Sequence, residues 1–173
     1  LGELTPAERM GLIDHQWALV RAGRADIASL LDLTAALGRE RDADVLMAVQ
    51  RPLSALAGRL APDQSVDCEA RLRAWVAAQY GAQLSELGFG PKRGENDDRR
   101  LRRARLVELV GQIGREASVV EQAAERCQSY LRSRASLDPN LADTVVSIAA
   151  CAGDARLHRA FERAMRDGRT PQE

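Results

Sequence analysis

Helix start and stop signals recur along the whole chain and constrain its fold more than any other feature. Thr5-Pro6-Ala7-Glu8 combines a capping hydroxyl, a proline at the first helical position and a glutamate three residues after the cap. Asp138-Pro139 repeats the cap and the proline. Between such signals apolar residues recur at spacings of three and four, and strand patterns are absent. The sequence therefore predicts an all-α protein.

These signals predict eight helices, six of which are followed by a glycine. The expected spans, in chain order, are about 6–22, 26–38, 42–60, 63–88, 97–113, a helix that contains 120–131 and ends before 137, 139–153 and 154–168. Pro52 lies inside the third helix and removes one backbone donor, so a kink is expected near 48–52.

The helices pair into about four antiparallel hairpins. The hairpins begin near residues 5, 42, 96 and 138, which are 37, 54 and 42 residues apart. Hairpins of about 40 to 47 residues are typical of HEAT-like α-solenoids, in which each pair buries its apolar face only against its neighbours. We therefore expect a HEAT-like α-solenoid.

The stretch from Gly88 to Gly114 is the densest in signals. A glycine-rich loop leads to Asn96, which can cap a helix whose first turn is acidic, and Gly114 is expected to stop that helix. The helix has an apolar side and a run of arginines that are too many to bury, namely Arg99, Arg100, Arg102, Arg103 and Arg105. We expect this basic flank to face solvent, acidic neighbours or another domain.

Length and composition indicate one folding unit spanning 1–173. Twenty-five basic and 25 acidic residues leave no net charge to attract nucleic acid or an anionic membrane, and no apolar run approaches the roughly 20 residues that span a bilayer. Cys68, Cys127 and Cys151 lie far apart within helical patterns, so buried reduced thiols are expected. A reducing, cytoplasmic location follows from this interpretation.

No catalytic, cofactor-binding or metal-binding residue can be assigned, and peptide-binding residues remain unknown. His15 and His158 come from opposite ends of the chain and belong to no zinc motif. Ser129 and Ser147 have no base nearby in the sequence. The Gly88-Phe89-Gly90 segment follows a helix rather than a strand, which favours a connecting loop over a phosphate-binding one.

The arginine run could in principle grip phosphates. Acidic residues adjoin it, however, and no aromatic residues are interleaved for base stacking. The expected partners therefore include neither nucleic acid nor a membrane. At the other end, Thr170-Pro171-Gln172-Glu173 repeats the start signal of Thr5 to Glu8, which suggests a fragment of a longer helical domain.

Four segments together resemble the C-terminal helical domain of the aminopeptidase N and ER aminopeptidase family of zinc metallopeptidases. They are LTPAERMGLIDHQWALVRAG at 4–23, GENDDRRLRRARL at 94–106, LDPNL at 137–141 and TPQE at 170–173. The resemblance implies a superhelix that packs over a catalytic domain of the same polypeptide and helps to enclose a chamber for peptide substrates. It implies zinc only in that catalytic domain, because the family's zinc ligands, catalytic glutamate and Gly-x-Met-Glu-Asn motif match no position here.

Two hypotheses follow. In the first, the chain is a noncatalytic C-terminal domain fragment of a zinc aminopeptidase that removes N-terminal residues from peptides. In the second, it is a free-standing α-solenoid that binds a protein partner in its groove, since solenoids offer a concave surface without any chemistry. A His-Glu-x-x-His stretch upstream in the full reading frame would support the first hypothesis.

Overall fold

The chain folds into a stack of helices. The structure, a computed structural model, describes residues 1–58 and 66–167. The helices are α1 (Pro6–Arg21), α2 (Ile27–Ala36), α3 (Ala43–Ala57), α4 (Val66–Leu87), α5 (Asp97–Val107), α6 (Ala117–Arg132), α7 (Pro139–Ala152) and α8 (Ala155–Asp167). A π-helical turn, η1 (Glu108–Ile113), extends α5, and a 3-10 turn, η2 (Arg134–Ser136), follows α6. The described residues contain no strand, so the all-α prediction is confirmed.

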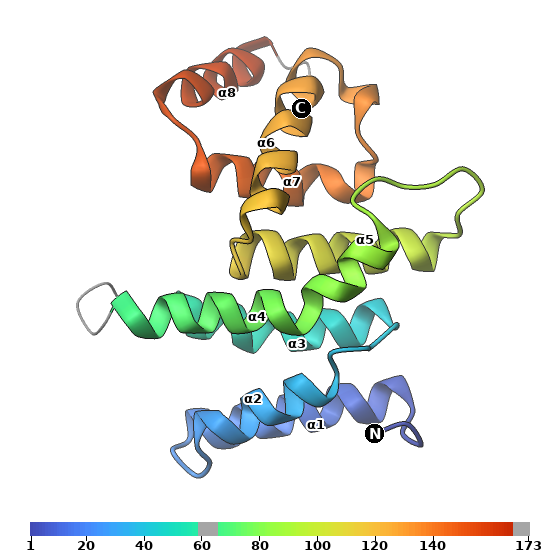
Figure 1. Ribbon diagram of the computed structural model, residues 1–173, viewed down its shortest axis with the longest axis vertical. Helices are drawn as coiled ribbons and strands as arrows, with labels where there is room; N and C mark the ends of the chain where they lie inside the picture. The colour runs from blue at the N-terminus through green and yellow to red at the C-terminus, as the bar shows by residue number, and fades with distance from the viewer. Residues whose placement is uncertain (59–65, 168–173) are drawn as a thin grey trace.

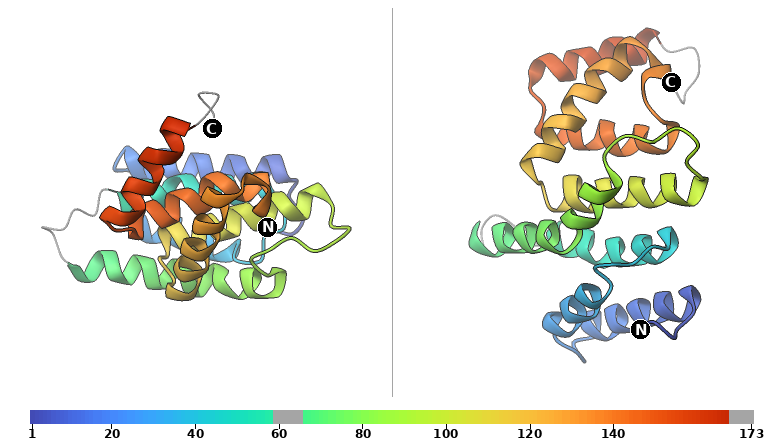
Figure 2. Two further views of the ribbon diagram at one scale, coloured as in Figure 1. Left: turned by 90° about the horizontal axis from the view of Figure 1, so that it is seen from above. Right: turned by 45° about the vertical axis from the view of Figure 1, so that its right-hand side comes forward.

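The helices are arranged as a solenoid, as the sequence predicts. One layer is built from α1, α3, α5 and α7, each packed on the next, while α2, α4 and α6 pack against members of that layer from the other side. Helices α1 and α8 lie at opposite ends of the stack (Figures 1 and 2). In the last hairpin, α8 has its main tertiary contact with α6.

Local signals explain where the helices begin. Thr5 and Glu8 form the expected capping box, in which the Glu8 amide donates to Thr5 Oγ1 at 3.3 Å and the Thr5 amide donates to Glu8 Oε2 at 2.7 Å. Asp42, Asn96 and Asp138 cap α3, α5 and α7 with their side chains. The predictions that fall on Leu60, Pro62 and 168–173 lie outside the described residues.

The structure bears on what the sequence predicts for helix interiors and ends. Helix α3 continues across Pro52, which is buried within it, so the proline does not end the helix. Gly23 and Gly88 adopt the left-handed conformation of a helix stop, with φ of 67° and 79°. Gly114 also follows the end of its helix, as predicted, but with φ of −70°. A Cβ at Gly114 would lie 3.2 Å from the Ala77 amide nitrogen, so its glycine allows close packing on α4.

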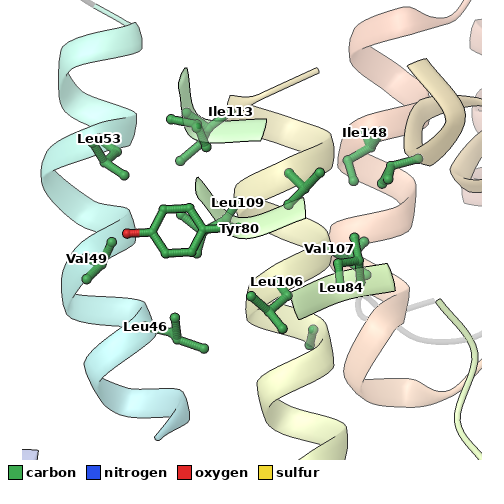
Figure 3. Packing of buried hydrophobic residues seen from close by; sticks show 14 of the residues in the cluster. Leu46, Val49, Leu53, Tyr80, Leu84, Leu106, Val107, Leu109, Ile113 and Ile148 are labelled. Atoms are coloured by element: carbon green, nitrogen blue, oxygen red, sulfur yellow. The ribbon is translucent and has the colours of Figure 1, made fainter. Parts of the chain in front are cut away.

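The continuous helix formed by α5 and η1 is the centre of the core. Figure 3 shows Leu106, Leu109 and Ile113 on this helix facing α3, with Tyr80 of α4 between the two helices. Ile148 of α7 lies on the opposite side of the helix. Leu106 and Leu109 are fully buried. Burial of one such side chain stabilises the fold by about 1.5 to 3 kcal/mol. Because these side chains are buried between α3 and α7, the helix holds the layers on both sides of it together.

Tyr80 adds a polar contact to this core. Its hydroxyl donates to the Thr34 carbonyl oxygen of α2 at 2.7 Å, and both residues are fully buried. Burial raises the pKa of Tyr80, so the hydroxyl keeps its proton and remains a donor. The contact fixes α2 relative to α4.

Arg103 of the basic flank faces an acidic neighbour, as one of the expected alternatives, but it is buried. Its exposure is only 1%. Its Nη1 and Nη2 atoms donate to Glu95 Oε2 and Oε1 at 2.6 and 2.5 Å, and its Nε donates to the Gly88 carbonyl oxygen at 2.9 Å. Burial is tolerated because the charge is paired and the guanidinium donors have acceptors.

We predict that Arg103→Met lowers the free energy of unfolding by on the order of 3 kcal/mol, because it leaves the Glu95 carboxylate without its buried partner. Arg99→Met is the matched control. Arg99 also pairs with Glu95, at 2.7 Å, but its side chain is 48% exposed, so its loss should cost less than about 1 kcal/mol. Urea denaturation of both variants checks the difference, and equal costs would contradict the assignment.

A second prediction concerns Gly111 in η1. A Cβ there would lie 2.6 Å from Ile148 Cδ1 and 2.8 Å from Val119 Cγ1, so Gly111→Ala should destabilise the fold by about 1 to 3 kcal/mol through overpacking. Gly11→Ala in α1 is the control, since nothing lies within 4 Å of its Cβ, and it should be neutral or stabilising by up to about 1 kcal/mol. Thermal melting should give a lower midpoint for Gly111→Ala than for Gly11→Ala. A Gly111→Ala midpoint equal to that of the wild type would refute this packing.

Candidate functional site

The glycine-rich loop between α4 and α5 is held in place by its own residues rather than prepared for a phosphate. Glu95 accepts from Arg103 and Arg99, and its Oε2 also accepts from the Lys92 amide at 3.2 Å. The hydrogen bonds from Arg103 lower the pKa of Glu95 to about 2. Phe89 is buried, and the Arg126 guanidinium lies 4.4 Å from the centroid of its ring. The prediction of a connecting loop fits this geometry.

Arg102 of α5 contacts the neighbouring helix α4. Arg102 donates through Nε and Nη2 to Gln83 Oε1 at 3.0 and 2.6 Å, and Gln83 Nε2 donates to the Gly38 carbonyl oxygen at 2.8 Å. Burial lowers the pKa of Arg102, and the nearby charges of Arg41 and Arg99 add to the effect. This chain of contacts joins α5 and α4 to the loop after α2.

Arg105 and Arg100 have acidic neighbours on their own helix. Arg105 Nη1 lies 3.3 Å from Glu108 Oε2, and Arg100 Nη1 lies 4.0 Å from Asp97 Oδ1. The arginine run is therefore mostly engaged within the protein, either in the core or in local ion pairs.

The two histidines are not brought together. His15 is exposed on α1, and His158 is exposed on α8, where its Nε2 lies 3.7 Å from Glu162 Oε1. No group of three or more histidine, cysteine or acidic residues in the described part of the chain could hold a metal ion. The structure thus brings together no zinc site from the residues that it describes.

The cysteines differ from one another in burial. Cys127 is fully buried in α6, and burial raises the pKa of its thiol. Cys68 and Cys151 are exposed, so the expectation of three buried thiols is wrong for these two. Both lie close to a helix end, Cys68 as the third residue of α4 and Cys151 as the next to last of α7.

Two structural features were missed by the sequence analysis. One is the buried pair of Glu95 and Arg103, and the spacing of Arg103 from Leu106, Val107 and Val110 places it on the apolar stripe, which could have indicated its burial. The other is a hollow between α6 and α8, which depends on tertiary packing and has no local signal. None of the helices in the described ranges is long and apolar enough to cross a membrane.

The fold and these residues define a class: a segment of an α-solenoid whose described part holds no metal cluster. Comparison with known proteins gives the family. Residues 1–173 match the family described as the ERAP1-like C-terminal domain, and the chain belongs to this family. The resemblance to the C-terminal domain of the aminopeptidase N family is thereby confirmed.

One curated relative is Aminopeptidase M1 of Arabidopsis thaliana. It is 25% identical over 131 residues, which cover 76% of this chain and 15% of the relative. The chain therefore spans a small part of the length of that protein, and the match adds an aminopeptidase to the relatives of this helical domain.

We predict that the Arg99–Arg105 flank does not confer tight binding to DNA or RNA, because Arg103 is buried and its neighbours are engaged by Glu95, Gln83 and Glu108. A salt titration with fluorescently labelled DNA and RNA measures this. Submicromolar affinity at physiological salt that falls steeply as salt rises would contradict the prediction.

Proposed function

We propose that this chain is a noncatalytic segment of a zinc aminopeptidase, one that removes N-terminal residues from peptides, and that its helix stack helps to enclose the peptide chamber. The observation that carries the proposal is the match of residues 1–173 to a domain family of aminopeptidases. The relationship to Aminopeptidase M1 supports it.

The proposal assigns the chain a structural role. A stack of helix hairpins offers an extended surface for covering another domain. Its partners would be the catalytic domain of the same polypeptide and, through the chamber, a peptide substrate. Zinc would belong to that catalytic domain, where it would supply the activation of water for peptide hydrolysis. The residues described here fit no such ion, so the proposal routes no chemical step through them.

We propose that the protein resides in a reducing compartment such as the cytoplasm. The three cysteines are odd in number and lie on three different helices, α4, α6 and α7. This arrangement suits thiols better than a disulfide framework.

The first test compares the isolated chain with the full polypeptide that contains it. We predict that the isolated chain binds no stoichiometric zinc and hydrolyses no aminoacyl substrate. The full polypeptide should hold one zinc and hydrolyse the substrate. Metal analysis and a chromogenic aminoacyl anilide assay give the two readouts, with circular dichroism to confirm helical folding. Zinc held tightly by the isolated chain would overturn the assignment, and an inactive, zinc-free full polypeptide would favour the adaptor hypothesis.

The chamber role needs a separate measurement. In the full polypeptide, deletion of this segment should change kcat/KM for a peptide of about ten residues more than for a single aminoacyl anilide, because only the peptide is long enough to reach the chamber wall. Equal changes for both substrates would argue against the chamber.

A further inference from the structure

Helix α8 stands partly apart from the rest of the stack, and a hollow of about 510 Å3 lies between it and α6. The two helices are seen beside each other at the C-terminal end in Figure 1. Arg132 at the end of α6 and Arg156 and Arg163 on α8 line the hollow. Leu131 and Leu157, both half-buried, add an apolar part to the same lining.

The positive charge of the hollow is largely uncompensated. None of the three arginines forms an ion pair with a carboxylate of the described residues, and Arg132 Nη2 donates to the Ser129 hydroxyl at 3.2 Å. The one carboxylate in the lining is Asp154. Its Oδ1 already accepts from the Arg156 and Leu157 amides at 3.0 and 2.9 Å, as the cap of α8. Three exposed arginines therefore line the hollow together with one carboxylate that already accepts two hydrogen bonds.

We propose that the hollow between α6 and α8 binds a peptide segment that carries carboxylate side chains next to aliphatic ones. A guanidinium group can hold a carboxylate through two parallel hydrogen bonds, and the three arginines supply such groups around the rim. Leu131 and Leu157 offer an apolar surface to an aliphatic side chain. The hollow is open to solvent and has room for a few side chains of the peptide.

The lining distinguishes an acidic peptide from other anions. A free phosphate would use the arginines but gain nothing from the apolar part of the hollow. A nucleic acid would call for aromatic side chains on which bases can stack, and the hollow has none. The combination of cationic rim and aliphatic lining is best used by a peptide with both kinds of side chain. This inference does not require the chamber role, because the binding belongs to the isolated chain.

The experiment measures binding of a fluorescein-labelled nonapeptide of alternating leucine and glutamate by fluorescence anisotropy at low salt. The matched peptide has glutamine in place of glutamate, and inorganic phosphate is added as a competitor. One double variant, Arg132→Gln with Arg163→Gln, removes two cations of the hollow. The control double variant, Arg159→Gln with Arg166→Gln, removes the same charge from parts of α8 that do not line it.

The expected result is a five- to tenfold weaker affinity, as an order of magnitude, in the first variant and less than about a twofold change in the control. The glutamine peptide should bind more weakly than the glutamate peptide. Millimolar phosphate should displace little of the bound glutamate peptide. Equal losses in both variants would show nonspecific attraction to α8 and overturn the proposal. Full displacement by phosphate, or equal binding of the glutamine peptide, would overturn it as well.

Discussion

The fold depends on how the charged N-terminal part of α5 is made compatible with a buried helix. Arg103 lies on the apolar side of this helix, next to Ala104, Leu106 and Val107, all of which are buried. A lone buried guanidinium would be strongly destabilising, and the bidentate pair with Glu95 offsets much of that cost. Because Glu95 belongs to the loop before α5, the same contact fixes the path of the chain between α4 and α5.

The rest of the stack is organised around this buried helix. The π-helical turn η1 prolongs α5, and Gly111 and Gly114 within and after it leave room for Ile148 of α7 and for the backbone of α4. Small residues at these two positions let helices approach closely, which a solenoid needs because each layer is stabilised only by its neighbours. The contacts at Gly111 and Gly114 therefore hold α5 and η1 closely against α7 and α4.

Much of the fold could be predicted from the sequence, because helix boundaries are set by local chemistry. Thr5, Asp42, Asn96 and Asp138 cap helices as expected, and the solenoid follows from the repeated hairpins. Predictions of burial were less successful. The number of arginines in α5 suggested a solvated flank, yet position decides burial, and a partner eight residues away made Arg103 a core residue.

The sequence could indicate little about a site, for a physical reason. A solenoid presents its binding surfaces through the placement of neighbouring helices, and such surfaces bring together residues that no motif connects. The α6–α8 hollow joins residues from Gln128 to Ala164 in this way. Family membership, rather than any constellation of residues, links the chain to aminopeptidases.

The pH dependence of stability tests the central role of the Arg103–Glu95 pair most directly. Arg103 lowers the pKa of Glu95 from its ordinary value of 4.5 to about 2, so the stabilisation is complete above pH 4.5 and is lost as the pH falls towards 2. Urea denaturation of the wild type and of Glu95→Gln across this range gives the measurement. The account predicts that the advantage of the wild type over Glu95→Gln is constant above pH 4.5 and shrinks steadily below it. A difference that does not change with pH, or no difference at neutral pH, would contradict it.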